Sequence, residues 1–288
     1  MAERELGGVY VANVTPFKDD GTLAVDEGAY LEHVAWLAGE GVRGVVPFGT
    51  NGEGPSVSLE EKLRVLEALF RRGLRVQVIP SVMQGNLPDT LRMVEALNDH
   101  PAAAVLVLPP YYFKPAGPEG LGRFYEPILE ASEHPVIAYH IPKYAVPVAP
   151  ELVSALPFWG VKDSGGEPGY AETVLGSGRG VLVGTEDAVR QKVGMGAQGA
   201  ISALANFAPA EVVALYEAAR SGDGGEALAE ALLEARAKTK EHSSPAVLKR
   251  LAQARHGAPM GTVRPPFLPL PEGYDPEGVI RIARRETA

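Results

Sequence analysis

The feature that most constrains the fold is an alternation, repeated over residues 8–206, between short apolar runs and segments with helical periodicity. This pattern is typical of βα units, whose strands form a parallel sheet. Eight such units within about 200 residues favour a closed (β/α)8 barrel over an open, doubly wound sheet. The expected strands are Val9–Val14, Gly44–Phe48, Val76–Ser81, Ala104–Leu108, Val136–His140, Trp159–Lys162, Val181–Gly184 and Ala200–Ser202.

Two of the expected helices have clear start and stop signals. Ser58, with Glu61 three residues later, forms a capping-box pattern, in which each side chain accepts a hydrogen bond from the other residue's backbone N–H. Gly73 follows the apolar stripe and can adopt the left-handed conformation that ends a helix. Asp26 and Gly41 mark the ends of a second helix in the same way. We expect both helices on the outside of the barrel.

The alternation stops after Asn206, where the chain becomes rich in Ala, Leu and Glu. We therefore divide the chain into a barrel, residues 1–207, and a region 208–288 that contains the last barrel helix and a helical C-terminal extension. The segment Arg264–Pro269 has a P-x-x-P spacing, which we interpret as a rigid connector packed on the body. The helices expected after the barrel are Glu211–Ala219, Glu226–Lys240 and Pro245–Arg255.

Charge and composition exclude several classes of function. The chain of 288 residues has no cysteine and a net charge of −9, so it offers neither a thiolate nor a basic surface for nucleic acid. Its first residues contain no apolar leader, and no later segment is long enough to span a membrane, so we expect a cytoplasmic protein without a membrane partner. The six histidines form no pair at ligand spacing, so we expect no metal.

The sharpest candidate for catalysis is Lys162, because barrel enzymes build their active sites at the carboxyl ends of the strands. It directly ends the apolar run Phe158–Val161, and the strand period places it on the same face as Gly160. If that face is the barrel interior, desolvation disfavours the ammonium and frees the amine to attack a ketone. Tyr139 ends the preceding strand and can supply the proton transfers that such chemistry needs. The alternatives are a strand-end lysine paired with an acid and a tyrosine of the core.

Other polar residues follow the remaining strands. The glycines of Gly49–Gly54 allow backbone amides to approach an anion, although the loop matches neither the dinucleotide-binding nor the P-loop motif. A Ser-His-Asp hydrolase is excluded because no G-x-S-x-G elbow follows a strand. The additional candidates are Thr50, Asn51, Tyr111, Tyr112, His140, Asp163, Gly184, Thr185 and Ser202.

Several motifs together resemble the dihydrodipicolinate synthase and N-acetylneuraminate lyase family of pyruvate-dependent aldolases. The resemblance covers nearly the whole chain and implies a barrel lyase that forms a Schiff base with a 2-keto acid and uses no external cofactor. The matching motifs are Val14-Thr15-Pro16-Phe17, Gly49-Thr50-Asn51-Gly52-Glu53, Pro110-Tyr111-Tyr112, Tyr139 before Pro142, Gly160–Gly166, and Gly199–Ser202 with Ala205-Asn206.

The resemblance also implies roles for individual residues. Lys162 matches the Schiff-base lysine, and Tyr139 matches the tyrosine that relays protons. Thr50 and Asn51 match the pair that binds the keto-acid carboxylate. Tyr112 matches a tyrosine that family members commonly supply across a dimer interface, which implies a homo-oligomer, either a dimer or a tetramer. Further expected substrate-binding residues are Gly184, Ser202, His140 and Tyr144.

Departures from the family pattern bear on the second substrate. Members that use aspartate semialdehyde carry an arginine two residues after the proline equivalent to Pro142, where this chain has Tyr144, and His140 replaces a usual asparagine. We therefore expect first the cleavage of 4-hydroxy-2-oxoglutarate or a 2-keto-3-deoxy sugar acid. The alternative is dihydrodipicolinate (4-hydroxy-tetrahydrodipicolinate) synthase activity. A rival of another class is a non-catalytic barrel that binds keto acids, but an intact Lys162 and Tyr139 argue against it.

Overall fold

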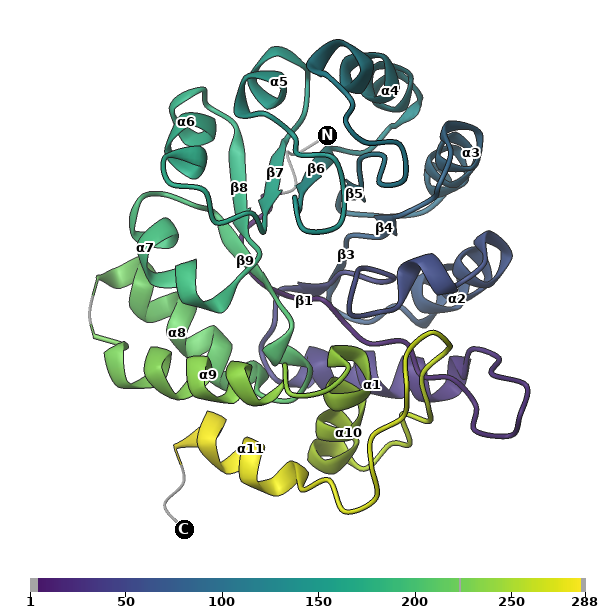
Figure 1. The fold of residues 1–288 in the computed structure, drawn as a ribbon, viewed down its shortest axis with the longest axis vertical. Helices are drawn as coiled ribbons and strands as arrows, with labels where there is room; N and C mark the ends of the chain where they lie inside the picture. Colours follow the sequence, from purple (N-terminus) through teal and green to yellow (C-terminus); the bar gives the residue numbers. More distant parts are fainter. Residues whose placement is uncertain (1–4, 223, 286–288) are drawn as a thin grey trace.

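The computed structural model describes residues 5–222 and 224–285, in which nine parallel strands form one sheet in the order β3-β2-β1-β9-β8-β7-β6-β5-β4. Helices surround this sheet, and the strands lie at the centre of the molecule (Figure 1). Residues 1–4, 223 and 286–288, which belong to the predicted barrel and C-terminal region, lie outside the described part. The strands are β1 (Gly8–Val11), β2 (Gly44–Val45), β3 (Gln77–Val78), β4 (Ser81–Val82), β5 (Val105–Val107), β6 (Val136–His140), β7 (Gly160–Asp163), β8 (Gly180–Val183) and β9 (Gly199–Ser202).

The sheet closes into a barrel through β3 and β4, which are two halves of one strand. Only Ile79 and Pro80 separate them, and β3 pairs with β2 whereas β4 pairs with β5. Hydrogen bonds continue across the break, from Ile79 N–H to Val45 O and from Leu106 N–H to Pro80 O. Proline has no N–H to donate, so the ladder is interrupted there. The predicted (β/α)8 barrel is confirmed, and its third predicted strand, Val76–Ser81, is observed as two short strands.

Side chains along each strand alternate between the barrel interior and the layer between sheet and helices. Ile137 and Tyr139 belong to the interior apolar cluster, whereas Ala138 and Val161 belong to the cluster beneath the helices. Of two consecutive residues at a strand end, only one can therefore face the barrel mouth.

The predicted helix caps are confirmed. Ser58 and Glu61 form the reciprocal capping box, and Gly73 ends the helix with φ of 63°. Asp26 accepts a hydrogen bond from the Ala29 N–H at the start of the first helix. The barrel helices are α1 (Glu27–Gly39), α2 (Leu59–Arg72), α3 (Leu87–Leu97), α4 (Pro118–Ala131), α5 (Pro150–Ala155), α6 (Tyr170–Gly176), α7 (Val189–Gly194) and α8 (Pro209–Ser221), with short 3₁₀ turns η1 (Gly54–Ser56), η2 (Glu186–Ala188) and η3 (Leu204–Asn206).

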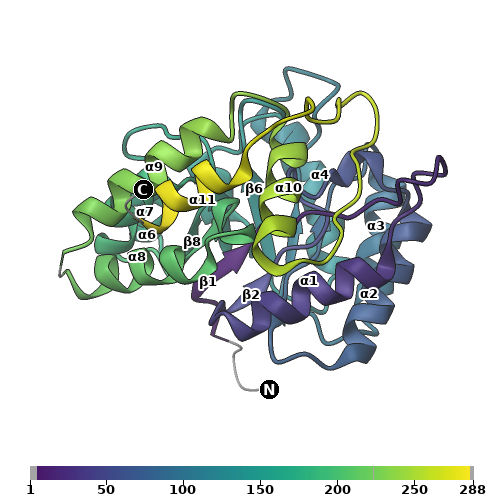
Figure 2. The same ribbon diagram turned by 90° about the horizontal axis from the view of Figure 1, so that it is seen from below.

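The C-terminal helices are α9 (Glu226–Lys238), α10 (Ser244–His256) and α11 (Pro276–Arg284), of which the sequence analysis missed α11. They pack on the side of the barrel where α1 and α8 lie (Figures 1 and 2). The Asp275 carboxylate caps α11 by accepting from two backbone N–H groups. No described helix is long and apolar enough to cross a membrane. The division of the chain at residues 207 and 208 stays a prediction.

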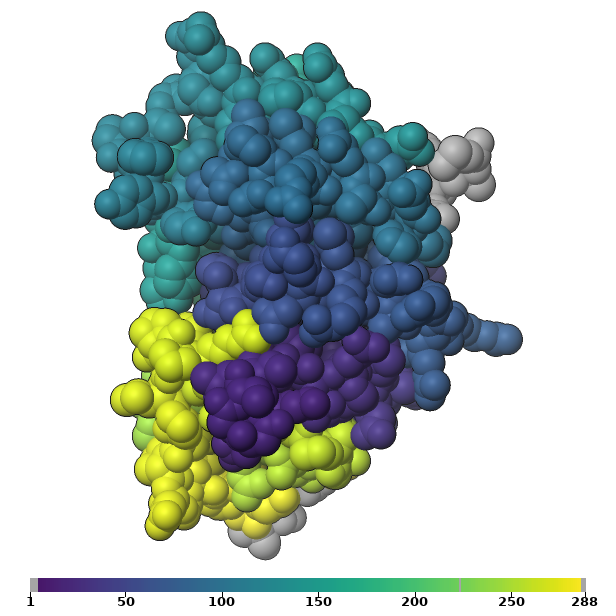
Figure 3. Space-filling model, turned by 90° about the vertical axis from the view of Figure 1, so that its right-hand side faces the viewer, coloured from purple at the N-terminus to yellow at the C-terminus, as the bar shows by residue number. Residues whose placement is uncertain are grey.

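The segment between α10 and α11 returns to the N-terminal part of the chain. Thr262 forms a bridge with Phe17, and the Arg264 side chain donates to Leu23 O at 2.8 Å. In Figure 3 this C-terminal chain, in yellow, lies directly against the N-terminal segment, in purple. Arg264 therefore packs on the body, as expected for the connector, whereas Leu268 is 76% exposed.

Candidate active site

Lys162 and Tyr139 meet in the interior at the carboxyl ends of β7 and β6. The two residues are direct partners in the parallel register, so the sheet itself places their side chains together. Only 4% of Lys162 and 3% of Tyr139 is exposed. The Lys162 ammonium donates to the Tyr139 phenol at 3.2 Å and lies 4.2 Å from the ring centroid. The alternation of strand residues thus gives a buried amine next to a group that can move protons.

Burial alone does not distinguish Lys162, because the described residues include four buried lysines. Lys192 and Lys249 each form an ion pair with a buried carboxylate, at 2.5 Å and 2.6 Å. Lys62 donates to Gln84 at 2.9 Å, and burial lowers the pKa of Lys62 to about 8. Among the contacts described, Lys162 has a phenol as its partner and no carboxylate, which leaves its amine free for chemistry.

Thr50 connects the loop after β2 to this pair. Its hydroxyl lies 3.3 Å from the Tyr139 phenol oxygen. Burial by itself raises the pKa of Tyr139, but the adjacent Lys162 ammonium and the hydrogen bonds from Thr50 and Lys162 outweigh it, so the pKa is lowered. A phenol with a lowered pKa gives up its proton more easily, which suits a proton relay.

Asn51 follows Thr50 and is partly buried beside the C-terminal helices. Its side-chain oxygen accepts from the Ser244 hydroxyl at 3.3 Å, at the start of α10. On the other side of the loop, the Thr15 hydroxyl donates to Gly52 O at 2.7 Å. The loop that carries Thr50 and Asn51 is therefore held from two sides.

Ser164 and Gly184 lie next to Lys162 and Tyr139, directly after β7 and β8. Ser164 follows Lys162 by two residues, on the same face of the strand, and it also contributes to lowering the pKa of Tyr139. Its hydroxyl is buried and forms no regular hydrogen bond within the described residues. A methyl group on Gly184 would lie 2.0 Å from this hydroxyl, so glycine is needed there. In the sequence, Ser164 stands out only as part of the Gly160–Gly166 motif, although the strand period indicates its position.

The structure does not bring two of the predicted residues, His140 and Ser202, to Lys162. Each lies on the outward face of its strand, because the inward positions belong to their neighbours Tyr139 and Ile201. The Ser202 hydroxyl donates to the buried Glu186 carboxylate at 2.7 Å. The strand period therefore places these two side chains away from Lys162, and their contact with substrate stays a prediction.

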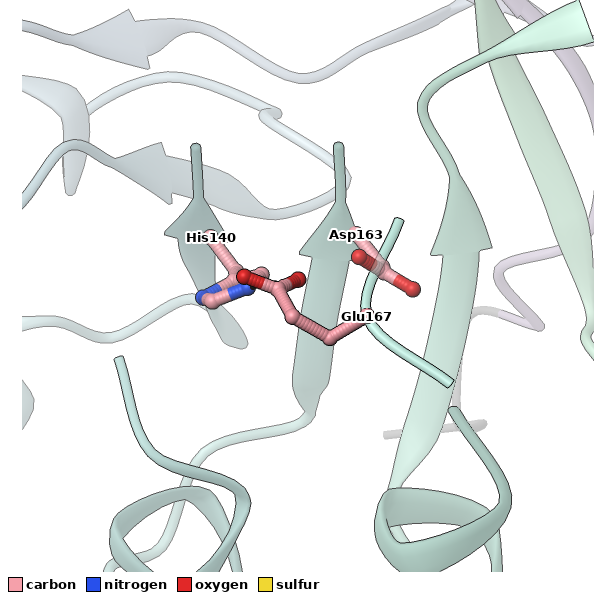
Figure 4. A group of neighbouring side chains, drawn as sticks. All are labelled: His140, Asp163 and Glu167. Carbon is pink, nitrogen blue, oxygen red and sulfur yellow. Dashed lines mark hydrogen bonds and ion pairs between the residues drawn. The ribbon is translucent and has the colours of Figure 1, made fainter. Parts of the chain in front are cut away.

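His140 instead belongs to a group with Asp163 and Glu167, whose possible metal ligand atoms lie within 4.8 Å of one another. Figure 4 shows His140 and Asp163 on neighbouring strands, with Glu167 reaching toward His140 from the loop after β7. His140 Nε2 lies 2.9 Å from the Glu167 carboxylate, and the Asp163 carboxylate accepts from the Lys192 ammonium at 2.5 Å. The Val148 N–H donates to His140 Nδ1 at 3.3 Å, so the ring proton belongs on Nε2. This donor pattern fits a hydrogen-bond network, and metal-free catalysis stays a prediction.

Tyr112 and Tyr144 lie at the rim of the barrel mouth. Tyr112 is 82% exposed and packs edge to face on Phe113, so within one chain it does not join the group around Tyr139. Tyr144 is 49% exposed, and the Lys143 ammonium lies over its ring, 5.0 Å from the centroid.

The fold and this geometry define the class of protein as a (β/α)8 barrel with a buried lysine beside a tyrosine at the carboxyl ends of its strands. Residues 5–282 match the Dihydrodipicolinate synthetase family. This chain therefore belongs to that family. Members of the family form or cleave carbon–carbon bonds, so the chain is a lyase of the pyruvate-dependent aldolase class.

Individual relatives agree with this assignment. A 4-hydroxy-tetrahydrodipicolinate synthase from Anaeromyxobacter sp. (strain K) is 35% identical, covering 93% of this chain and 94% of its own. A crystal structure of dihydrodipicolinate synthase has a TM-score of 0.84 at 28% identity and covers 97% of each chain. The 2-keto-3-deoxygluconate aldolase of Sulfolobus, in complex with D-KDPG, shares the fold with a TM-score of 0.87 at 24% identity, over 96% of this chain and 95% of its own.

Proposed function

We propose that Lys162 forms a Schiff base with the C2 carbonyl of pyruvate or a longer 2-keto acid. The observation that carries this proposal is the 3.2 Å contact between the Tyr139 phenol and the buried Lys162 amine, which has no carboxylate partner among the described contacts. We propose that Thr50 and Asn51 bind the keto-acid carboxylate, and their position before a glycine turn at the same barrel mouth supports this role. No external cofactor is needed, since the iminium itself accepts the electrons.

The geometry supports a short sequence of steps. The neutral Lys162 amine attacks C2, and the carbonyl oxygen takes a proton from Tyr139 to give a carbinolamine. Loss of water leaves an iminium. In the cleavage direction the C4 hydroxyl gives its proton to the Tyr139 phenolate and the C3–C4 bond breaks, which releases an aldehyde. The electron pair of that bond moves into the iminium to form an enamine. Protonation at C3 and addition of water then release pyruvate and free Lys162.

For the second substrate, the curated relatives favour the alternative of the sequence analysis over its first expectation. Several relatives at 34–35% identity are named 4-hydroxy-tetrahydrodipicolinate synthase. We therefore put condensation of pyruvate with aspartate semialdehyde first. Lys143 supports this assignment, because its ammonium over the Tyr144 ring supplies a positive charge at the rim, where an arginine is expected.

Cleavage of a 4-hydroxy-2-keto acid or a 2-keto-3-deoxy sugar acid is the second candidate. It is favoured by Tyr144, since a phenol cannot hold a substrate carboxylate through two charge-assisted hydrogen bonds as a guanidinium does. The Ser164 hydroxyl, which is buried near Tyr139 and forms no regular hydrogen bond within the described residues, offers a hydrogen bond to a hydroxyl of such a substrate.

We also propose that Tyr112 acts across an interface between two copies of the chain. Its 82% exposure in the single chain, next to the exposed Phe113, supports a role in which a second copy covers these rings. A dimer or tetramer and a cytoplasmic location remain proposals from the sequence.

Borohydride reduction in the presence of pyruvate tests the Schiff base. We expect a stable adduct that peptide mapping locates at Lys162 and that Lys162→Met abolishes. Lys62→Met is the matched control, because Lys62 is the other buried lysine without a carboxylate partner in the described residues, and it should leave the adduct intact. An adduct at Lys62, or none, would refute the proposal.

The second substrate is tested on one preparation of the enzyme. Initial rates with pyruvate plus aspartate semialdehyde are compared with cleavage of 4-hydroxy-2-oxoglutarate and 2-keto-3-deoxygluconate. A higher kcat/KM for condensation establishes the synthase, and a higher kcat/KM for either cleavage establishes the aldolase. Prolonged treatment with a chelator should leave the preferred reaction unchanged.

A further inference from the structure

The loop after β2, residues 48–54 (the β2 loop), contains two residues in a strained conformation. Phe48 and Glu53 have φ of 59° and 53°, in the left-handed region that favours glycine. They lie on either side of Thr50 and Asn51, the residues expected to bind the keto-acid carboxylate. Such conformations persist only where the surrounding structure fixes them.

A fully buried ion pair provides that fixation. The side chains of Glu53 and Lys249 are 0% and 2% exposed, and the Lys249 ammonium donates to Glu53 Oε1 at 2.6 Å. The other oxygen, Oε2, accepts from the Arg264 backbone N–H at 3.0 Å. Lys249 also donates to Thr262 O at 2.6 Å and lies 4.2 Å from the ring centroid of Phe17. Both oxygens of the Glu53 carboxylate thus point at groups about 200 residues further along the chain.

Arg264 extends the same contact to the helix after the loop. Its guanidinium forms hydrogen bonds with both oxygens of Glu61 and with Ser56 O and Leu23 O. These partners come from the turn behind the β2 loop, from the first turn of α2 and from the segment before α1. The Ser244 hydroxyl, on α10, contacts Asn51 directly. The C-terminal extension therefore contacts both the middle of the β2 loop, at Asn51, and its C-terminal part, at Glu53.

A buried ion pair is a poor way to gain stability, because desolvation of the two charges offsets most of their attraction. Its effect is instead on geometry. A carboxylate held by two donors at defined positions restricts both the position and the orientation of the Glu53 backbone. A shift of about 1 Å in a group that orients the substrate is enough to lower rates by roughly 10².

We propose that Lys249, Glu53 and Arg264 are positioning residues for the keto-acid carboxylate, through which the C-terminal extension sets the location of Thr50 and Asn51. The proposal rests on the proposed function, because it assumes that the β2 loop binds this carboxylate. It assigns a role in substrate binding to residues that do not touch the reacting atoms.

The test measures the pyruvate concentration that gives half-maximal borohydride adduct in the intact enzyme. Lys249→Met removes the cation, and Glu53→Gln keeps the shape of the side chain but turns an amide N–H₂ toward one of its two donors. We expect each to raise the half-saturating pyruvate concentration at least about tenfold, while the adduct at saturating pyruvate still forms at Lys162. Lys249→Arg, which keeps the charge, should recover part of the affinity.

A control variant separates positioning from simple loss of stability. Leu232→Ala removes a fully buried side chain from α9, a helix whose main contacts are with α8, α11 and η2. All variants are assayed well below their melting temperatures. Leu232→Ala should keep the half-saturating pyruvate concentration of the parent, even when its melting temperature falls as far as those of the Lys249 and Glu53 variants. If Lys249→Met does not fold, Glu53→Gln and Lys249→Arg carry the test.

The outcomes are distinct from those of the proposed function. An adduct in the parent, with half-saturation in the Lys249 and Glu53 variants equal to that of Leu232→Ala, overturns the positioning role alone. Absence of an adduct in the parent overturns the proposed function itself.

Discussion

Two loops bring polar groups to Lys162, and the chain builds them in different ways. The β2 loop, residues 48–54, has non-glycine residues in left-handed conformations and a carboxylate with no exposed surface, paired with Lys249. The loop after β7, residues 164–169 (the β7 loop), has glycines at its two positive φ angles, Gly166 and Gly169. Its main side-chain contact is that of the half-exposed Glu167 with His140. The comparison teaches that one side of the mouth is fixed by buried charge, whereas the other bends at glycines and faces solvent.

The largest expected effect is a difference in unfolding free energy between variants that disrupt the side-chain contact of each loop. Lys249→Met leaves the Glu53 carboxylate buried without its cation, which costs about 3–5 kcal/mol of unfolding free energy. Glu167→Gln removes only the charge of a half-exposed partner of His140, which costs at most about 1 kcal/mol. Urea denaturation of the two variants and the parent measures both values. Equal losses would mean that the two loops are held with similar strength.

The next effect concerns Tyr139, whose phenol lies between Thr50 of the β2 loop and Lys162, with Ser164 of the β7 loop nearby. Tyr139→Phe should lower turnover by roughly 10²–10⁴, as expected for loss of a positioned proton-transfer group. Steady-state kinetics in the preferred direction measures it, and Thr50→Val serves as a comparison that removes only the hydroxyl contact. A rate within about threefold of the parent would make Tyr139 a packing residue.

A smaller effect should appear in the pH dependence of stability, in the helices behind the β2 loop. His33 of α1 is buried and lies between Asn206, at 3.1 Å, and His256 of α10, at 3.0 Å. Burial lowers the pKa of His33 to about 3, and burial also lowers the pKa of His256. Both pKa values lie below the value of about 6.5 for the unfolded chain, so the unfolded state binds more protons as the pH falls. The stability that these two neutral histidines contribute is therefore complete above pH 6.5 and decreases as the pH falls below it.

For His33 alone this loss is about 1.4 kcal/mol per pH unit, or about 2 kcal/mol between pH 6.5 and 5. Denaturant unfolding at several pH values measures the slope. His33→Gln should reduce the slope of unfolding free energy against pH, whatever the stability of the variant itself. His134→Gln is the control and should leave this slope unchanged, because His134 lies on the far side of the barrel, before β6. A slope unchanged in His33→Gln would place the titrating group elsewhere.

The smallest effect tests the glycines. Gly166→Ala meets open space and adds only the strain of a left-handed alanine, about 1 kcal/mol. Gly54→Ala in the β2 loop would put its methyl group 1.9 Å from Phe48 O, so we expect the larger loss of melting temperature there. Thermal unfolding compares the two, and a larger shift for Gly166→Ala would reverse our view of which loop is tightly packed.

Much of the fold was predictable because its signals are local. The period of apolar residues gives strands and helices, and the caps at Ser58 and Asp26 act within one turn of helix. The same period gives the contact of Lys162 with Tyr139, because strand-end residues on neighbouring parallel strands meet. It also excludes His140 from the interior once Tyr139 is placed there, a step that the sequence analysis did not take.

The tertiary structure alone decided which distant groups complete the site. Nothing near Glu53 in the sequence indicates that its cation is Lys249, 196 residues later, because such a pair depends on how α10 packs on the barrel. The sequence equally cannot tell Lys249 from Lys62 or Lys192, which are buried on helices with different partners. Strand and helix periods are set by local backbone sterics and therefore appear in the sequence, whereas pairing of buried charges is set by packing between distant segments, which only the folded chain brings together.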